Sequence, residues 1–430
     1  MKKIDMTVKQ LALLFAPMLF VFWCNMFSVA VTPVPGVYWI TLLMTAFGAL
    51  VAVYQLKKKP LPAKGLLIPL AGLGCITLVT TLLFCFTNIP NIFSFPFAIR
   101  QTSDSILWLC VFAWAYAIGR NGSDASRKMT ALAYTVPVFA LLHAGVIKAN
   151  AGQGIPELSM IYYLLLLLPF VFSLKNKPVM WTMFLLIWIR VLLSVKRTAF
   201  LALAAALVTY LAVRLYTHRH EFSFKKRSFL LKGAALLMVL VVSTVICTVD
   251  DPFAPLRNLA QSLVPAASQA PGELVPAPAP TPTSSVNLFD RMTTTGNYGG
   301  PRRMDIWKHT AGMLAESSPM ELIFGHGFNA VYHLSELKLS AHSDLLEVLY
   351  DYGILGFVCC MGFCLYLVCR FRYILQNKTH FAAAYAVSIV LLGCMIPVSH
   401  LIIYPTYFLF LCVFWGVLMG ECDRETNSRR

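Results

Sequence analysis

Two adjacent arginines and one histidine are the residues of this sequence best suited to chemistry on a polar substrate. Arg302 and Arg303 lie in GGPRRMDIW and His342 lies in AHSDLLEVL, within one polar stretch over residues 250–350. An arginine fork donates two hydrogen bonds at once, so it suits phosphate or diphosphate better than a lysine does. Trp307 follows Arg303 by four residues, which places both on one side of a short helix. Two exposed arginines are, however, more often a solvated charge pair than a binding site.

His342 is the candidate proton acceptor. It stands at the start of a helix expected over about residues 342–353, and an unperturbed imidazole titrates at about pH 6.5, close to neutrality. A histidine at a helix start is more often a structural polar residue than a base. His326 and His333 lie in the same stretch and compete with His342 for the role.

Arg197 and Lys196 form a second candidate anion site, in SVKRTAF. The sequence places them in the first turn of an apolar helix, where a positive charge opposes the helix dipole. A bound anion, held by the guanidinium and the free backbone N–H groups, would compensate that charge. An equally good reading is that both side chains extend to lipid headgroups.

The composition identifies the elements that must position these residues as membrane helices. Apolar residues make up 58% of the 430 and charged residues 13%, with a mean hydropathy of +0.70. A soluble globular domain does not reach these values. We therefore expect an all-α, polytopic membrane protein.

Apolar runs long enough to cross the hydrocarbon core, about 20 residues each, number about twelve. They cover residues 11–31, 34–55, 65–87, 104–119, 129–147, 156–174, 178–194, 198–216, 230–248, 352–370, 381–398 and 399–419.

The distribution of basic residues predicts the orientation of these spans. With a cytoplasmic N-terminus, the cytoplasmic connections and both tails would hold 24 of the 35 lysines and arginines. Basic residues are retained on the cytoplasmic face, so the long polar stretch is expected outside. The net charge of +16 then reflects topology and attraction to anionic lipid, and we expect no nucleic-acid partner. The first apolar segment is expected to stay uncleaved, because another span follows at once.

The external stretch divides into a tether and a helical part. Residues 265–285 are rich in proline, alanine and serine, and we expect them to be disordered. Apolar periodicity predicts a short amphipathic helix over about Met304–Glu316, and GHGFN at 325–329 is typical of a glycine-rich turn. The sequence shows no cysteine or histidine spacing typical of a metal site, and no phosphate-binding glycine loop.

A transporter or a flippase of lipid-linked glycans is the main alternative function. Ion-coupled transporters keep carboxylates near the bilayer midplane. The nineteen aspartates and glutamates fall in the external stretch, at span ends, in tails or in short connections, which disfavours coupled transport. A structural or sensor protein is a third reading, and it gives no reason for arginine and histidine to recur at one membrane face.

In its order of motifs the chain resembles the bacterial O-antigen ligase and O-antigen polymerase family. The shared features are about twelve spans, a large external loop before the last few, and four short motifs. These motifs are an SxxR-type arginine (Arg197), Arg-xxx-Trp (Arg303, Trp307), a GxG turn (Gly325, Gly327) and a run from His342 through Leu345, Leu346, Leu349 and Gly353 to Gly356. Ser343 departs from the asparagine that many members have after the histidine, and the Pro-rich insert is a second departure.

The resemblance implies a GT-C-like fold and an enzyme that moves a glycan from an undecaprenyl diphosphate carrier to an acceptor hydroxyl, with no bound metal, nucleotide sugar or cofactor. It implies that Arg197 and Arg303 hold the diphosphate while His342 deprotonates or orients the acceptor. Arg302, Trp307 and Lys196 would bind substrate beside them. The partners would be the lipid-linked glycan donor, membrane lipid, and a glycan, lipid or protein acceptor.

The expected organisation is nine helices over residues 1–249, an external catalytic loop over 250–350, and three helices with a cytoplasmic tail over 351–430. The protein would lie in the bacterial inner membrane with both termini cytoplasmic and the large loop periplasmic. The sequence leaves open whether it is a polymerase, which extends a repeat-unit chain, or a ligase, which attaches a finished glycan.

Overall fold

The computed structural model describes residues 36–58, 64–89, 94–122, 124–150, 161–194, 196–217, 303–397, 402 and 405–429. Within these residues the protein is helical and contains no β-strand. The expected spans over 11–31 and 230–248, the Pro-rich segment 265–285 and Arg302 lie outside the described residues.

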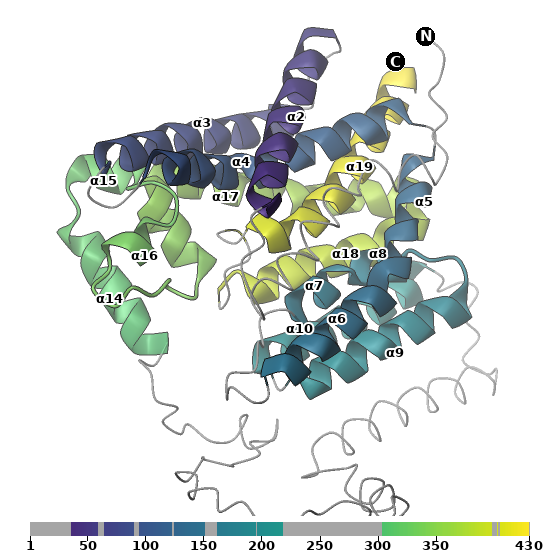
Figure 1. The fold of residues 1–430 in the computed structure, drawn as a ribbon. Coiled ribbons are helices and arrows are strands. Elements are labelled where there is room, and N and C mark those ends of the chain that lie inside the picture. Colours follow the sequence, from purple (N-terminus) through teal and green to yellow (C-terminus); the bar gives the residue numbers. More distant parts are fainter. Residues whose placement is uncertain are drawn as a thin grey trace, which may run out of the picture.

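Sixteen helical segments follow one another in the described chain (Figure 1). They are α2 (Gly36–Lys58), α3 (Lys64–Thr87), α4 (Phe95–Asn121), α5 (Ala125–Met129), the 3-10 helix η1 (Thr130–Thr135), α6 (Val136–Asn150), α7 (Ile161–Leu166), α8 (Leu168–Phe172), α9 (Lys177–Leu193), α10 (Arg197–Thr217), α14 (Arg303–Glu316), α15 (Pro319–Phe324), α16 (Ala330–Leu334), α17 (Asp344–Asn377), α18 (Thr379–Met395) and α19 (Pro405–Arg429).

Five helices are long and apolar enough to cross a membrane, and three shorter apolar segments accompany them. The five are α3, α4, α10, α17 and α19. These helices confirm the all-helical, membrane-protein class. The full count of twelve spans and the external position of the loop stay predictions.

Helix α4 is longer than its sequence pattern predicts. It begins at Phe95 rather than near residue 104, so Asp104 lies inside the helix and pairs with Arg100 one turn earlier at 3.4 Å. The position of Asp104 relative to the membrane stays a prediction, although this carboxylate lies within a helix that is long and apolar enough to cross it. The intrahelical ion pair explains how the helix continues through two charged residues.

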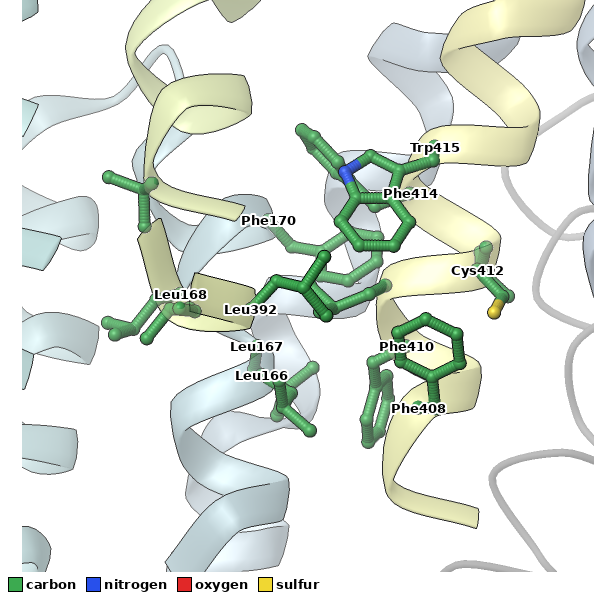
Figure 2. Packing of buried hydrophobic residues seen from close by; sticks show 14 of the residues in the cluster. Leu166, Leu167, Leu168, Phe170, Leu392, Phe408, Phe410, Cys412, Phe414 and Trp415 are labelled. Carbon is green, nitrogen blue, oxygen red and sulfur yellow. The ribbon is translucent and has the colours of Figure 1, made fainter. Parts of the chain in front are cut away.

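Helix α19 is the centre of the hydrophobic core. Its residues Phe408 to Met419 are almost all fully buried, as expected for a helix that is apolar on every side. Figure 2 shows Phe408, Phe410 and Phe414 of α19 with Phe170 of α8 and Leu392 of α18. The Phe170 and Phe414 rings meet edge to face with centroids 5.4 Å apart, a geometry that the aromatic quadrupole favours.

A smaller hydrophobic cluster lies apart from this core, where α14, α15 and α16 gather beside α3, α4 and α17 (Figure 1). It contains Phe84 of α3, Ala98 of α4, Val331 of α16 and Tyr350 of α17, and Leu314 of α14 packs against it. The predicted amphipathic helix is confirmed as α14, with Ile306 buried. The polar helical part is thus attached to the ends of long apolar helices.

The break in α17 at Gly353 is the backbone feature that this attachment requires. Gly353 has φ 64° and ψ −173°, outside the helical region, so the predicted helix after His342 does end there. A side chain at this position would be strained and would collide with the carbonyl of Ile323.

We predict that Gly353→Ala destabilises the protein by about 1–3 kcal/mol, because alanine disfavours this conformation and no space exists for its methyl group. The apparent melting temperature of the purified protein in detergent measures the effect. Gly312→Ala in α14 is the matched control, since nothing lies within 4 Å of the added atom and alanine favours a helix. An equal melting temperature for Gly353→Ala and wild type would contradict the prediction.

Candidate functional site

The turn at residues 325–329 is locked against the break in α17. Gly325 and Gly327 have φ of 85° and 105°, and the backbones of Gly325 and Gly353 approach too closely for a side chain on either. The N–H of Gly327 donates to the carbonyl of Asp351 at 2.7 Å. The glycine-rich turn expected from GHGFN is confirmed, and its function is to dock the polar helices on α17.

A buried carboxylate completes this lock. Asp351 is fully buried and accepts the backbone N–H of Asn329 at 2.7 Å and that of Val331 at 3.3 Å. Ala330 N–H also hydrogen-bonds to it. Three N–H groups at the start of α16 therefore find their acceptor in a side chain of another helix, which satisfies donors that a helix start leaves open. We use the name Asp351–Gly353 lock for these contacts together with the turn at 325–329.

His326 is fully engaged in structural contacts. Its ring stacks on Tyr350 with centroids 4.1 Å apart, and Nδ1 lies 3.1 Å from the Tyr350 carbonyl oxygen. Its Nε2 lies 3.7 Å from a carboxylate oxygen of Glu321. These contacts indicate that His326 has a structural role and is not the catalytic base.

His333 joins the polar helices to α4. Its Nε2 lies 2.9 Å from the side-chain amide nitrogen of Gln101, and its ring packs near those of Phe84 and Phe97. Burial and the nearby Lys338 ammonium lower the pKa of His333. The ring is therefore neutral at neutral pH, so its Nε2 can accept the amide hydrogen bond.

His342 is held in an uncommon backbone conformation directly before α17. Its φ is 55°, in the left-handed region, and its side chain is half-buried. The buried carboxylate of Glu347 accepts the backbone N–H groups of Ala341 and His342. The observed left-handed geometry thus has a local cause, and strained backbone of this kind gathers at functional sites.

The start of α17 is also fixed to the chain between the last two helices. The N–H of Asp344 donates to the carbonyl of Ile396 at 2.9 Å, and the Asp344 carboxylate accepts the N–H of Ile402 at 3.0 Å. Asp344 is fully buried. His342 therefore lies two residues before a helix start that is hydrogen-bonded to the distant connection between α18 and α19.

For the predicted arginines of the site, the structure describes at most the backbone. Arg197 and Arg303 are the first residues of α10 and α14, which confirms helix starts at both, but their side chains and all of Arg302 lie outside the described part. Lys196 Nζ lies 4.3 Å from the ring centroid of Tyr162. The convergence of Arg197, Arg303 and His342 around one cavity therefore stays a prediction.

Trp307 is half-buried in α14, and its indole Nε1 has no hydrogen-bond partner among the described residues. A buried indole N–H usually finds an acceptor. The atom is thus suited to a ligand oxygen. The same residues include no group of three or more histidine, cysteine, aspartate or glutamate side chains placed to hold a metal ion.

Sequence reasoning missed the residues that hold the site together: Asp351, Glu347 and Gln101. It also assigned no partner to Arg190 of α9, whose guanidinium lies 3.1 to 3.2 Å from Nδ1 of the buried His143. The signal available in the sequence was weak. Asp351 and Glu347 follow each other at helical spacing before an apolar run, which equally fits a solvated helix start.

The apolar helices and the polar helical part at one end define an integral membrane protein. In a comparison with protein families, residues 182–361 match the O-antigen ligase family. The resemblance to that family is therefore confirmed over the segment that contains Arg197, Arg303 and His342. No curated protein sequence matches the chain.

We predict that Asp351→Asn loosens α16 from α17. An asparagine side chain can turn only one acceptor oxygen toward the three N–H groups, so the change should cost about 1–3 kcal/mol. Limited proteolysis between α15 and α17, together with the apparent melting temperature, measures this loss. Glu336→Gln is the matched control because Glu336 is exposed. Equal protease resistance of Asp351→Asn and wild type would show that the carboxylate is dispensable.

Proposed function

We propose that the protein is a glycan transferase of the ligase or polymerase type, acting on a glycan linked to undecaprenyl diphosphate. The observation that carries the proposal is the family match over residues 182–361, which supports a role in glycan assembly. The donor, the acceptor hydroxyl and the periplasmic face of the inner membrane belong to the proposal. So does the division into helices over 1–249, a catalytic loop over 250–350 and helices over 351–430.

Arg197 and Arg303 are proposed to hold the diphosphate. Each begins a helix, α10 of 21 residues and α14 of 14, so each arginine backbone lies at the positive end of a helix dipole, beside free backbone N–H groups. No acidic residue occupies the first turn of α10, while α14 has Asp305 there. Preorganised positive charge lowers the barrier most where negative charge develops, here on the departing diphosphate.

His342 is proposed to act on the acceptor. The acceptor oxygen forms a bond to the anomeric carbon of the glycan while the bond from that carbon to the diphosphate oxygen breaks. The hydroxyl proton passes to the imidazole, and the carrier leaves as undecaprenyl diphosphate. The hydrogen bonds of Ala341, His342 and Asp344 to fixed partners support this role, because a general base needs a fixed position relative to the proton it accepts.

Trp307, Arg302 and Lys196 are proposed to bind substrate around the diphosphate. The indole N–H of Trp307 could donate to a phosphate or sugar oxygen. Lys196 already lies against Tyr162, so its ammonium would contribute a point charge from a position fixed by the aromatic ring. The proposal places no metal or other cofactor in the site.

Deletion of the gene, followed by analysis of surface polysaccharide, tests the proposed function and its alternative. Short glycans of a single repeat indicate a polymerase, and long chains that are not attached to an acceptor indicate a ligase. Lipid-linked glycan retained on the cytoplasmic face would favour the flippase. An unchanged polysaccharide profile would contradict all three.

We predict that Arg303→Lys loses most transfer activity although the positive charge is kept, because lysine cannot donate two parallel hydrogen bonds. Transfer in isolated membranes, normalised to the amount of inserted protein, measures the effect. The neighbouring Arg302→Lys is the comparison variant and should lose less activity than Arg303→Lys. Equal sensitivity of the two would indicate a diffuse basic patch.

We predict that His342→Ala abolishes transfer but leaves donor binding nearly unchanged, since the arginines hold the diphosphate end. His342→Gln separates a base from a positioning residue, because glutamine keeps hydrogen bonding but takes no proton near neutral pH. Rate against pH in reconstituted protein is the measurement. A flat wild-type profile together with an active glutamine variant would remove the general-base role.

A further inference from the structure

A groove in the apolar helices lies at the end of α4 away from the candidate site. It has a volume of about 220 Å³ and is lined by Leu66, Leu70 and Ala71 of α3 and by Leu109, Ala113 and Arg120 of α4, with a contribution from α2. The first turns of α4 contact the polar helices through Gln101, whereas Arg120 is in its last turn. The groove therefore lies toward the end of α4 that is opposite to the polar helices.

Arg120 is an unusual lining residue for an apolar groove, since only 7% of it is exposed. Its guanidinium makes no hydrogen bond or ion pair with the described residues. The neighbouring carboxylate, Asp423, is already engaged, because it accepts from Tyr116 at 2.6 Å and from Arg370 at 3.1 Å. A buried charge without a counter-ion is costly, and in a membrane helix it points to a ligand or a functional partner.

The surroundings identify the chemistry of that partner. The remaining lining is apolar except for Tyr116, and from Leu109 to Arg120 the groove follows α4 for eleven residues, about 16 Å at the helical rise. Lys57, Lys58, Lys59 and Lys64 stand in the sequence where α2 ends and α3 begins. Such basic clusters attract anionic headgroups on the cytoplasmic face.

We propose that this groove binds one acyl chain of an anionic phospholipid whose phosphate pairs with Arg120. The guanidinium fork donates two hydrogen bonds to the phosphate oxygens, and the stripe Leu109, Ala113 and Leu70 covers the chain. This site is separate from the one proposed for glycan transfer and does not depend on it.

Native mass spectrometry of the full-length protein in detergent tests the proposal, with palmitoyl-oleoyl phosphatidylglycerol and phosphatidylcholine of the same chains as probes. Wild type should retain phosphatidylglycerol in preference to phosphatidylcholine. Arg120→Gln should weaken phosphatidylglycerol retention about tenfold, the value of a charge-assisted hydrogen bond, and should narrow the preference over phosphatidylcholine. Ala113→Phe, which fills the groove, should reduce retention of both.

Arg127→Gln is the matched control, because Arg127 lies just beyond α4, is 59% exposed and is 3.9 Å from Asp124. It removes the same charge and should retain phosphatidylglycerol as wild type does. Unchanged retention in Arg120→Gln, or an equal loss in Arg127→Gln, would overturn the proposal. Inorganic phosphate that displaces phosphatidylglycerol equally from wild type and from Ala113→Phe would also overturn the proposal, because it would indicate a site for the free anion. Should Arg120→Gln not fold, Ala113→Phe, which keeps the arginine, decides the question.

Discussion

The pairing of the Asp351 carboxylate with three backbone N–H groups of α16 is the interaction on which the polar end of the molecule depends. It joins α16 to the break in α17, next to the close contact between Gly325 and Gly353. Burying a carboxylate is costly unless its oxygens are hydrogen-bonded. Here part of that cost is offset by donors that a helix start would otherwise leave open.

A second buried acidic side chain fixes the backbone at the candidate histidine. Glu347 lies one turn before Asp351 and accepts the N–H groups of Ala341 and His342. The first turns of α17 thus fix α16 through Asp351 and fix the chain before α17 through Glu347. The polar end is a small folded unit, and the ends of α3 and α4 contribute residues to its hydrophobic cluster.

Local patterns in the sequence predicted local structure well here. The helix over Met304–Glu316, the turn at 325–329 and the helix end at Gly353 all follow from apolar spacing or from glycine, which act within a few residues. The structural roles of Asp351 and Gln101 could not be predicted in this way. Their partners lie in other helices, at Asn329 and His333, and periodicity gives no information on such pairings. The start of α4 differs from the predicted start of the span for a related reason. Two charged residues, Arg100 and Asp104, suggest the end of an apolar span in the sequence, and only the structure shows that they pair with each other inside the helix.

Two sets of contacts lie around His342, and they differ in the sequence separation of the residues that they join. They can therefore form at different times during synthesis. The Asp351–Gly353 lock joins residues about 20 to 30 positions apart, so it can close while the chain is still being inserted. Asp344 must wait for Ile396 and Ile402, which are synthesised about 50 residues later. A nascent chain without its last two helices would therefore have an assembled polar end in which Glu347 already holds the backbone at His342, while the start of α17 would still lack the contacts of Asp344 with Ile396 and Ile402.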